Sequence, residues 1–188
     1  MEQPHNKTRR RLLVLAAHAV PAGVVATGVS GCAQASANDR QLVFKTLNEA
    51  LAELARLTSP QALPPATAWN WAQTLTHLAQ SIEFSMLGFP QPKHPLFQRT
   101  VGAAAFNVFA WRGRMTHNLA EPIPGAPALD ANTGVDAALA RLKLAASAFA
   151  NWAGPLKPHF AYGELSKAEY EQAHAMHLAN HFSAFQQA

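Results

Sequence analysis

The sequence predicts an all-α fold, a helical bundle with about five helical segments. Apolar residues recur at spacings of three and four over most of the chain, which is the period of an amphipathic helix. Clusters of proline and glycine separate these segments, and no stretch of useful length shows the alternation typical of a strand. The chain contains one cysteine, so no intramolecular disulfide is expected to support the fold.

Residues 1–31 are predicted to be an export signal that lies outside the fold. Arg9 and Arg10 belong to Thr-Arg-Arg-Arg-Leu-Leu, which resembles the twin-arginine export motif, and an apolar stretch follows. This stretch ends in Val-Ser-Gly-Cys, which resembles a bacterial lipobox with Cys32 as the lipid attachment site. An uncleaved membrane helix is the alternative, but it leaves the lipobox without a role. We therefore expect a lipidated tether over residues 32–38 and the helical bundle over residues 39–188.

These motifs predict a lipid-anchored protein on the periplasmic face of a bacterial envelope membrane. The outer membrane is expected in a Gram-negative host, because Ala33 and Gln34, rather than aspartate, follow the cysteine. The export signal accounts for most of the net charge of +4, since residues 32–188 contain 11 basic and 10 acidic residues. No basic and aromatic patch indicates nucleic-acid binding. The expected partners are the membrane, through the lipid anchor, and a small-molecule substrate or ligand; a homodimer is left open.

The first two helices are predicted from leucine and aromatic spacing. A helix over about residues 39–58 carries four leucines at helical intervals, and Ser59-Pro60 ends it. A second helix follows Thr67, which is a suitable N-cap residue, and runs to about residue 87. Its apolar stripe consists of Trp71, Leu75, Leu78 and Ile82.

Three further helices are predicted downstream. One covers about residues 96–119 and includes a Gly-Ala run that allows close contact, and one covers about residues 134–152. The last begins at Ser166, where Ser166-Lys-Ala-Glu169 matches a capping box.

The most informative residues are three histidines on this last helix. His174, His177 and His181 are separated by three, four and seven residues, so they fall within about 60° of one another on the helix surface. Apolar neighbours such as Phe182 indicate that this stripe faces the interior. Buried imidazoles are costly unless their nitrogens find partners, and a divalent metal is a suitable partner. The alternative is a helix whose histidines tolerate partial burial.

A catalytic zinc site usually needs a third protein ligand, for which His77 is the best candidate. It lies near the edge of the second helix's apolar stripe, on a polar flank, although a surface or hydrogen-bonded histidine would show the same pattern. His174 is either a ligand or a hydrogen-bond donor that orients a ligand. His94 and His117 are not expected to affect metal binding. A di-iron site is not expected, because it needs two Glu-x-x-His units in the bundle.

Several motifs together resemble the DinB-like (YfiT-like) superfamily, in its branch called domain of unknown function 1569. Trp-Asn-Trp and Thr-His77-Leu-Ala are similar to its second helix, residues 159–170 to its "HPxFGxLS…EW" segment, and residues 177–185 to its closing "HLxxHxxQF" pattern. Phe160 and Ala184 depart from these patterns. The resemblance implies a four-helix bundle of DinB-like type that holds a metal through His77, His177 and His181.

Two functions follow as expectations. The first is a metal-dependent enzyme, a transferase or hydrolase for small molecules, with zinc as the first choice and nickel or iron as alternatives. Glu83, Glu171 and His174 are candidates for its general base. We expect its pocket between the second and last helices, with walls from Trp71, Phe84, Tyr170 and Phe182. The second is a non-catalytic envelope lipoprotein whose metal is structural or absent.

Overall fold

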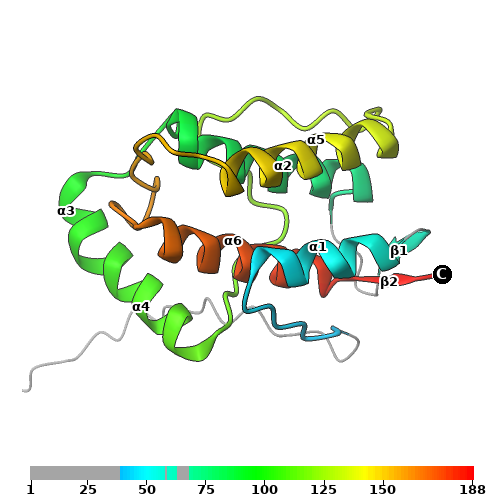
Figure 1. Ribbon diagram of the computed structural model, residues 1–188, viewed down its shortest axis with the longest axis horizontal. Helices are drawn as coiled ribbons and strands as arrows, with labels where there is room; N and C mark the ends of the chain where they lie inside the picture. The colour runs from blue at the N-terminus through cyan, green and yellow to red at the C-terminus, as the bar shows by residue number, and fades with distance from the viewer. Residues whose placement is uncertain (1–38, 58, 63–67) are drawn as a thin grey trace, which may run out of the picture. The chain divides into compact units, whose positions relative to one another are not determined.

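The computed structural model describes residues 39–57, 59–62 and 68–188 (Figure 1). The predicted signal and tether, residues 1–38, lie outside the described residues, and so does the predicted cap residue Thr67.

The described chain is mostly helical, as predicted. Its elements in chain order are α1 (Leu47–Arg56), β1 (Pro60–Ala62), α2 (Trp71–Leu87), α3 (Pro95–Phe97), the π-helical η1 (Gln98–Gly102), α4 (Ala103–Arg112), α5 (Val135–Ala150), α6 (Lys167–Phe182) and β2 (Phe185–Gln187). Figure 1 shows α2 and α5 together along the top, α6 and α1 below them, and α3 to α4 at the left.

The long helices bury a common apolar core. α2 packs along α5, and α6 contacts α1, α2 and α4. Leu75 and Leu78 of α2, Leu142 of α5 and Leu178 of α6 are completely buried in this core. A smaller apolar cluster, which includes Phe106 and Met176, joins α4 to α6. α6 therefore contacts apolar side chains on several sides, which fixes its rotation about its own axis.

Side-chain caps set the ends of the two helices that carry the candidate ligands. The predicted capping box of α6 is confirmed, because Ser166 and Glu169 each accept from the other's backbone N–H. α2 begins with an equivalent box formed by Asn70 and Gln73. Each reciprocal pair satisfies two amides that a helix start would leave without partners.

The first predicted helix is shorter in the structure. Residues 39–46 are not helical, and α1 begins only after Thr46, whose hydroxyl accepts from the Glu49 amide. The preceding segment instead bonds to the end of α6: the Arg40 amide donates to the Ser183 carbonyl, and the Leu42 amide donates to the Ser183 hydroxyl. These contacts between distant residues replace the helix that local spacing predicted.

Two other predictions need correction. The third helical segment ends at Arg112, not near residue 119, because Gly113 adopts a left-handed conformation with φ of 63°. The expectation of no strand is also wrong, since β1 and β2 pair as a two-stranded antiparallel sheet. Strands of three residues are too short to show an alternating pattern in the sequence.

Candidate metal centre

The structure brings His77, His177 and His181 together. His77 lies on α2, while His177 and His181 lie one turn apart on α6, and all three are buried, with 2%, 9% and 1% of their surface exposed. One ring nitrogen from each residue lies within 4.8 Å of those of the other two. The ring centroids are 4.9–5.0 Å apart in all three pairs. These three side chains can therefore hold one metal ion.

The nitrogen positions fit that donor set. The Nε2 atoms of His77 and His177 are 3.2 Å apart. Two nitrogen ligands on one tetrahedral zinc, each about 2.0–2.1 Å from the metal, would be about 3.3 Å apart. His181 Nε2 is buried and has no hydrogen-bond partner among the described residues. A buried polar nitrogen without a partner is unfavourable, and a metal ligand bond would remove this cost.

Neighbouring side chains contact all three of these rings. Ser81, one turn after His77 on α2, places its hydroxyl 3.2 Å from His177 Nδ1, so that Nε2 is the nitrogen left for a metal. The Trp69 ring packs on His77 at 4.8 Å and stacks on His181 at 6.1 Å between centroids. Such neighbours hold an imidazole in the orientation that ligation needs.

The electrostatics of the cluster favour neutral imidazoles. Burial, with a smaller contribution from His117, lowers the pKa of His77 to about 3. Burial and the neighbouring histidines lower the pKa values of His177 and His181 well below their usual range. Only neutral imidazole has a lone pair to offer a metal, so the cluster is in its ligating form at neutral pH.

A fourth histidine, His117, adjoins the cluster, which sequence reasoning missed. Its ring centroid lies 5.0 Å from that of His177 and 5.1 Å from that of His181. His117 Nδ1 donates to the backbone carbonyl of Asn118 at 3.0 Å, so the lone pair of the neutral ring is on Nε2. The group whose ring nitrogens lie within 4.8 Å of one another consists of His77, His177 and His181 and does not include His117, so the expectation that His117 does not affect metal binding stays a prediction. His94 is exposed on α3's N-terminal side.

A cavity of about 130 Å³ adjoins these histidines. It is lined by one carboxylate and by polar, aromatic and aliphatic side chains from α2, α6 and two loops: His77, Ser81, Met115, His117, Glu121, Pro122, Ile123, His159, Phe160, Tyr162, Ala173, His174 and His177. The predicted walls Trp71 and Phe182 pack in the core instead, against each other and against Phe44 and Phe185. Phe84 and Tyr170 also pack against the core and do not line the cavity. The loops, which sequence reasoning left without a role, supply most of its lining.

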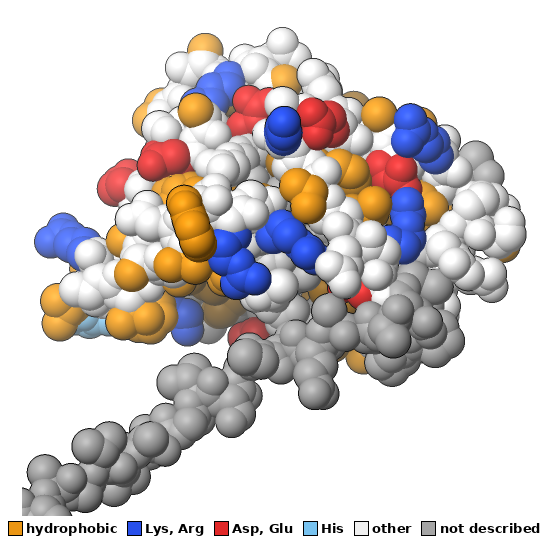
Figure 2. All heavy atoms as spheres, turned by 90° about the horizontal axis from the view of Figure 1, so that it is seen from below, with side chains coloured by type: hydrophobic (Ala, Val, Ile, Leu, Met, Phe, Trp, Pro, Cys, Tyr) orange, Lys and Arg blue, Asp and Glu red, His pale blue; other side chains and the backbone are white. Residues whose placement is uncertain are grey.

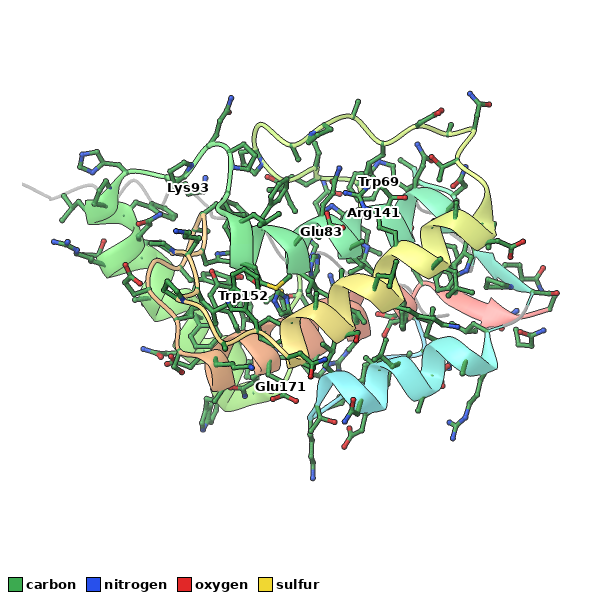
Figure 3. All side chains as sticks on the ribbon, turned by 45° about the horizontal axis from the view of Figure 1, so that its top comes forward. Trp69, Glu83, Lys93, Arg141, Trp152 and Glu171 are labelled. Atoms are coloured by element: carbon green, nitrogen blue, oxygen red, sulfur yellow. The ribbon has the colours of Figure 1, made fainter. Side chains whose placement is uncertain are left out.

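The three candidates for a general base have different positions. Glu83 forms a two-bond ion pair with Arg141, at 2.9 and 2.7 Å, and Figure 3 shows the two side chains together. Glu171 does not line the cavity, and its label in Figure 3 lies well away from Glu83. His174 lines the cavity, but its Nε2 pairs with the Ser85 hydroxyl at 3.3 Å rather than with a candidate ligand. Glu121 is the carboxylate that lines the cavity, and it was not predicted.

Figure 2 shows one face of the described residues, and the expectation that the protein does not bind nucleic acid stays a prediction. Basic side chains there are interspersed with acidic and hydrophobic ones. In the part of the chain that the structure describes, no helix has the length and apolar character needed to cross a membrane. Arg9, Arg10 and Cys32 lie outside the described residues, so their predicted roles in export and lipidation stay predictions.

The comparisons with known proteins agree with the motifs quoted above. No curated protein and no solved structure matches the chain. A family described as "Protein of unknown function (DUF1569)" matches residues 36–188, which include every candidate ligand. The chain therefore belongs to the DUF1569 family.

Proposed function

We propose that this protein is a metal-dependent enzyme that carries out group transfer or hydrolysis on a small molecule. The observation that carries this proposal is the buried cluster of His77, His177 and His181, whose ring nitrogens converge beside a cavity. Zinc is the first choice of metal, and nickel and iron are alternatives, because imidazole suits all three.

The metal would supply Lewis-acid activation of a carbonyl, water or thiol group. The protein's own residues contribute position and proton transfer. Trp69 and Ser81 orient the ligands, and the apolar side chains Met115 and Ile123 exclude water from part of the cavity. His117 has a lone pair on Nε2 and Glu121 carries a carboxylate, so either one can accept a proton from a bound molecule.

A structural metal is the second candidate, and His117 is the observation that favours it. If the His117 ring joined His77, His177 and His181 on the metal, the site would have four protein ligands. Structural zinc sites have four protein ligands, whereas catalytic sites keep one position open. The protein would then be a binding protein with a metal-stabilised fold.

Metal analysis and cobalt(II) substitution separate these functions. We expect one metal ion per chain in the wild type, and metal-dependent turnover in a screen of ester, amide and thiol-conjugation substrates that is lost in His181→Ala. An open site predicts that the cobalt(II) absorption spectrum changes when azide is added and that His117→Ala leaves the spectrum of the azide-free form nearly unchanged. A spectrum that ignores azide but changes in His117→Ala would favour the structural metal. Absence of stoichiometric metal would contradict both.

We further propose export by the twin-arginine route and lipid anchoring on the periplasmic face of the membrane, which the sequence motifs alone support. Cys32→Ser should release the protein from membrane fractions, and replacing Arg9 and Arg10 by lysine should reduce export. A Cys32→Ser variant that still sediments with membranes would contradict the anchor.

The family fold is part of the same proposal. We propose that α1, α2, α5 and α6 correspond to the four helices of a DinB-like bundle. The packing of α2 on α5, and of α6 on both α1 and α2, supports this assignment. An experimental structure superposed on a DinB-like protein would test it.

A further inference from the structure

The cavity has a second group of polar side chains that the proposed metal chemistry does not use. His159, in the loop between α5 and α6, and His174 on α6 both line it. Tyr170 contacts both rings, with centroid distances of 6.3 Å to His159 and 5.5 Å to His174. We call His159 and His174 the recognition end of the cavity. His77 and His177 also line it, and together with His181, which lies behind the lining, they form what we call the metal end.

The loop around His159 fixes which ring nitrogen carries hydrogen. The backbone amides of Ala161 and Tyr162 both donate to His159 Nδ1, each at 3.1 Å. Nδ1 must therefore carry the lone pair, and the neutral ring carries its hydrogen on Nε2. No hydrogen bond joins Nε2 to another described residue, so it is the N–H group that His159 can offer to a ligand.

Neighbouring residues hold this ring rigidly in place. Tyr162 stacks on it with a centroid distance of 4.2 Å and an interplanar angle of 8°. Gln98 Nε2 donates to the carbonyls of both His159 and Phe160, and Gly163 closes the turn with φ of 79°. A donor held by so many contacts loses little freedom when it binds a ligand.

The environment of His174 leaves this ring with a lone pair to offer to a ligand, whereas His159 offers an N–H. The Ser85 hydroxyl donates to the Ile82 carbonyl at 2.6 Å, so its single hydrogen is already used. The Ser85 oxygen must then accept from His174 Nε2, and the lone pair of the neutral ring is on Nδ1. The two histidines thus give the cavity one N–H donor and one nitrogen acceptor. Burial lowers the pKa of each to about 3, so both are uncharged at neutral pH.

We propose that His159 and His174 recognise an uncharged group that accepts one hydrogen bond and donates another, such as a carboxamide. The amide oxygen accepts from His159, and the amide N–H donates to His174. No Lys or Arg lines the cavity, and the carboxylate of Glu121 lines it, so a carboxylate anion has no cation at this end to offset its desolvation. The volume of about 130 Å³ is close to the roughly 150 Å³ of an apolar cavity that holds benzene.

This inference deepens the proposed function by naming a substrate class, and it rests on that function only in treating the cavity as its binding site. It can be tested without turnover or metal. Benzamide, benzoate and toluene have similar shapes but differ in charge and hydrogen bonding. Their affinities for the metal-free, full-length protein can be compared by calorimetry or by NMR titration of the imidazole ¹⁵N signals.

The matched variants are His159→Asn and His94→Asn. Asparagine at position 159 keeps an oxygen that can accept from the Ala161 and Tyr162 amides, but it has no N–H at the position that His159 Nε2 occupies. His94 also accepts a backbone amide through Nδ1, from Leu96 at 3.2 Å, but it is exposed and does not line the cavity. His174→Leu removes the acceptor without changing the loop, so it provides a second test if the His159 variant folds poorly.

We expect benzamide to bind at least tenfold more tightly than benzoate or toluene and to shift the His159 and His174 signals. His159→Asn and His174→Leu should each weaken benzamide binding about tenfold, the effect of one neutral hydrogen bond, whereas His94→Asn should not. Equal affinity for benzamide and toluene, tighter benzoate binding, or full affinity in both cavity variants would overturn the inference. Benzamide selectivity in a protein that binds no metal would support the recognition end while refuting the metal-dependent enzyme.

Discussion

The two ends of the cavity differ in how their buried histidines are satisfied. At the metal end, His181 Nε2 has no hydrogen-bond partner among the described residues, and the Nε2 atoms of His77 and His177 face each other at 3.2 Å. At the recognition end, His159 Nδ1 accepts two backbone amides, and His174 Nε2 donates to Ser85. The metal end is thus incomplete without a further group, whereas the recognition end is held in place by the protein itself.

This difference indicates what each end needs from its surroundings. Buried polar atoms without partners destabilise a fold, so the metal end should depend on its ion for stability as well as for chemistry. The recognition end should keep its geometry with or without metal.

Acid should have the largest effect. The pKa values of His77, His159 and His174 are about 3 in the fold, against about 6.5 in an unfolded chain. Between these values the unfolded state binds more protons, so the free energy of unfolding falls as pH falls, by about 1.4 kcal/mol per pH unit for each such histidine. His177 and His181 add to this loss, since their pKa values are also lowered.

We therefore expect metal-free protein to unfold within about two pH units below 6.5. Circular dichroism against pH would measure the transition. Excess zinc should move the transition to lower pH by binding the folded state, and His177→Ala/His181→Ala should abolish this shift. An acid transition below pH 4 in metal-free protein would show that these histidines do not control stability.

Loss of metal ligands should have the next largest effect. His77→Ala, His177→Ala and His181→Ala should each weaken zinc binding by more than about 100-fold, since even changes to neighbouring hydrogen-bond partners cost 10–100-fold. Competition with a chromophoric chelator would measure the affinity, with His94→Ala as the exposed control. Stoichiometric zinc in the double variant of α6 would remove these residues as the site.

Gly102→Ala should disturb the recognition end alone. A Cβ atom at position 102 would overlap the backbone carbonyl of Ala161, in the loop that positions His159. We expect a loss of about 1–3 kcal/mol in the free energy of unfolding, as for other overpacked sites, and weaker benzamide binding with zinc affinity unchanged. Gly134→Ala is the control, because nothing lies within 4 Å of a Cβ there. If Gly102→Ala weakened zinc binding as much as benzamide binding, the recognition end and the metal end would not be separate.

The smallest expected effect distinguishes two serines one turn apart on α2. Ser81 pairs with His177 and Ser85 pairs with His174. Ser81→Ala should weaken zinc binding about tenfold through the loss of an orienting partner, whereas Ser85→Ala should leave zinc affinity unchanged. The same chelator competition would measure both. If Ser85→Ala weakened zinc binding and Ser81→Ala did not, the assignment of His177 to the metal end and of His174 to the recognition end would be wrong.

The features that could be predicted from the sequence are those that depend on residues close together in the chain. The spacing of His177 and His181 on one helix and the polar flank of His77 made these residues candidates, and the family resemblance then implied the set of three that the structure brings together. The helix over residues 134–152 and the capping box at Ser166 were also confirmed, because caps and periodicity depend on residues close in the chain.

Other features depend on contacts between distant segments. His117 lies in a proline-rich loop, and the loop's later residues are tied to α2 by Gln73 and Gln80, which donate to the carbonyls of Leu129 and Pro127. Nothing in the spacing of His117 indicates that this loop carries it to α6. His159 was visible only as part of a motif, since its tautomer depends on the turn that follows it.

One helix carries residues of both ends: His174 belongs to the recognition end, and His177 and His181 belong to the metal end. A ligand that shifts or rotates α6 at His174 must also move the two metal ligands one and two turns further along. Thermodynamic linkage then requires reciprocity, so any factor by which an amide ligand changes zinc affinity is the factor by which zinc changes amide affinity. A zinc titration with and without benzamide therefore measures this coupling directly: separate ends predict the same zinc affinity in both, and any difference is the coupling that α6 transmits.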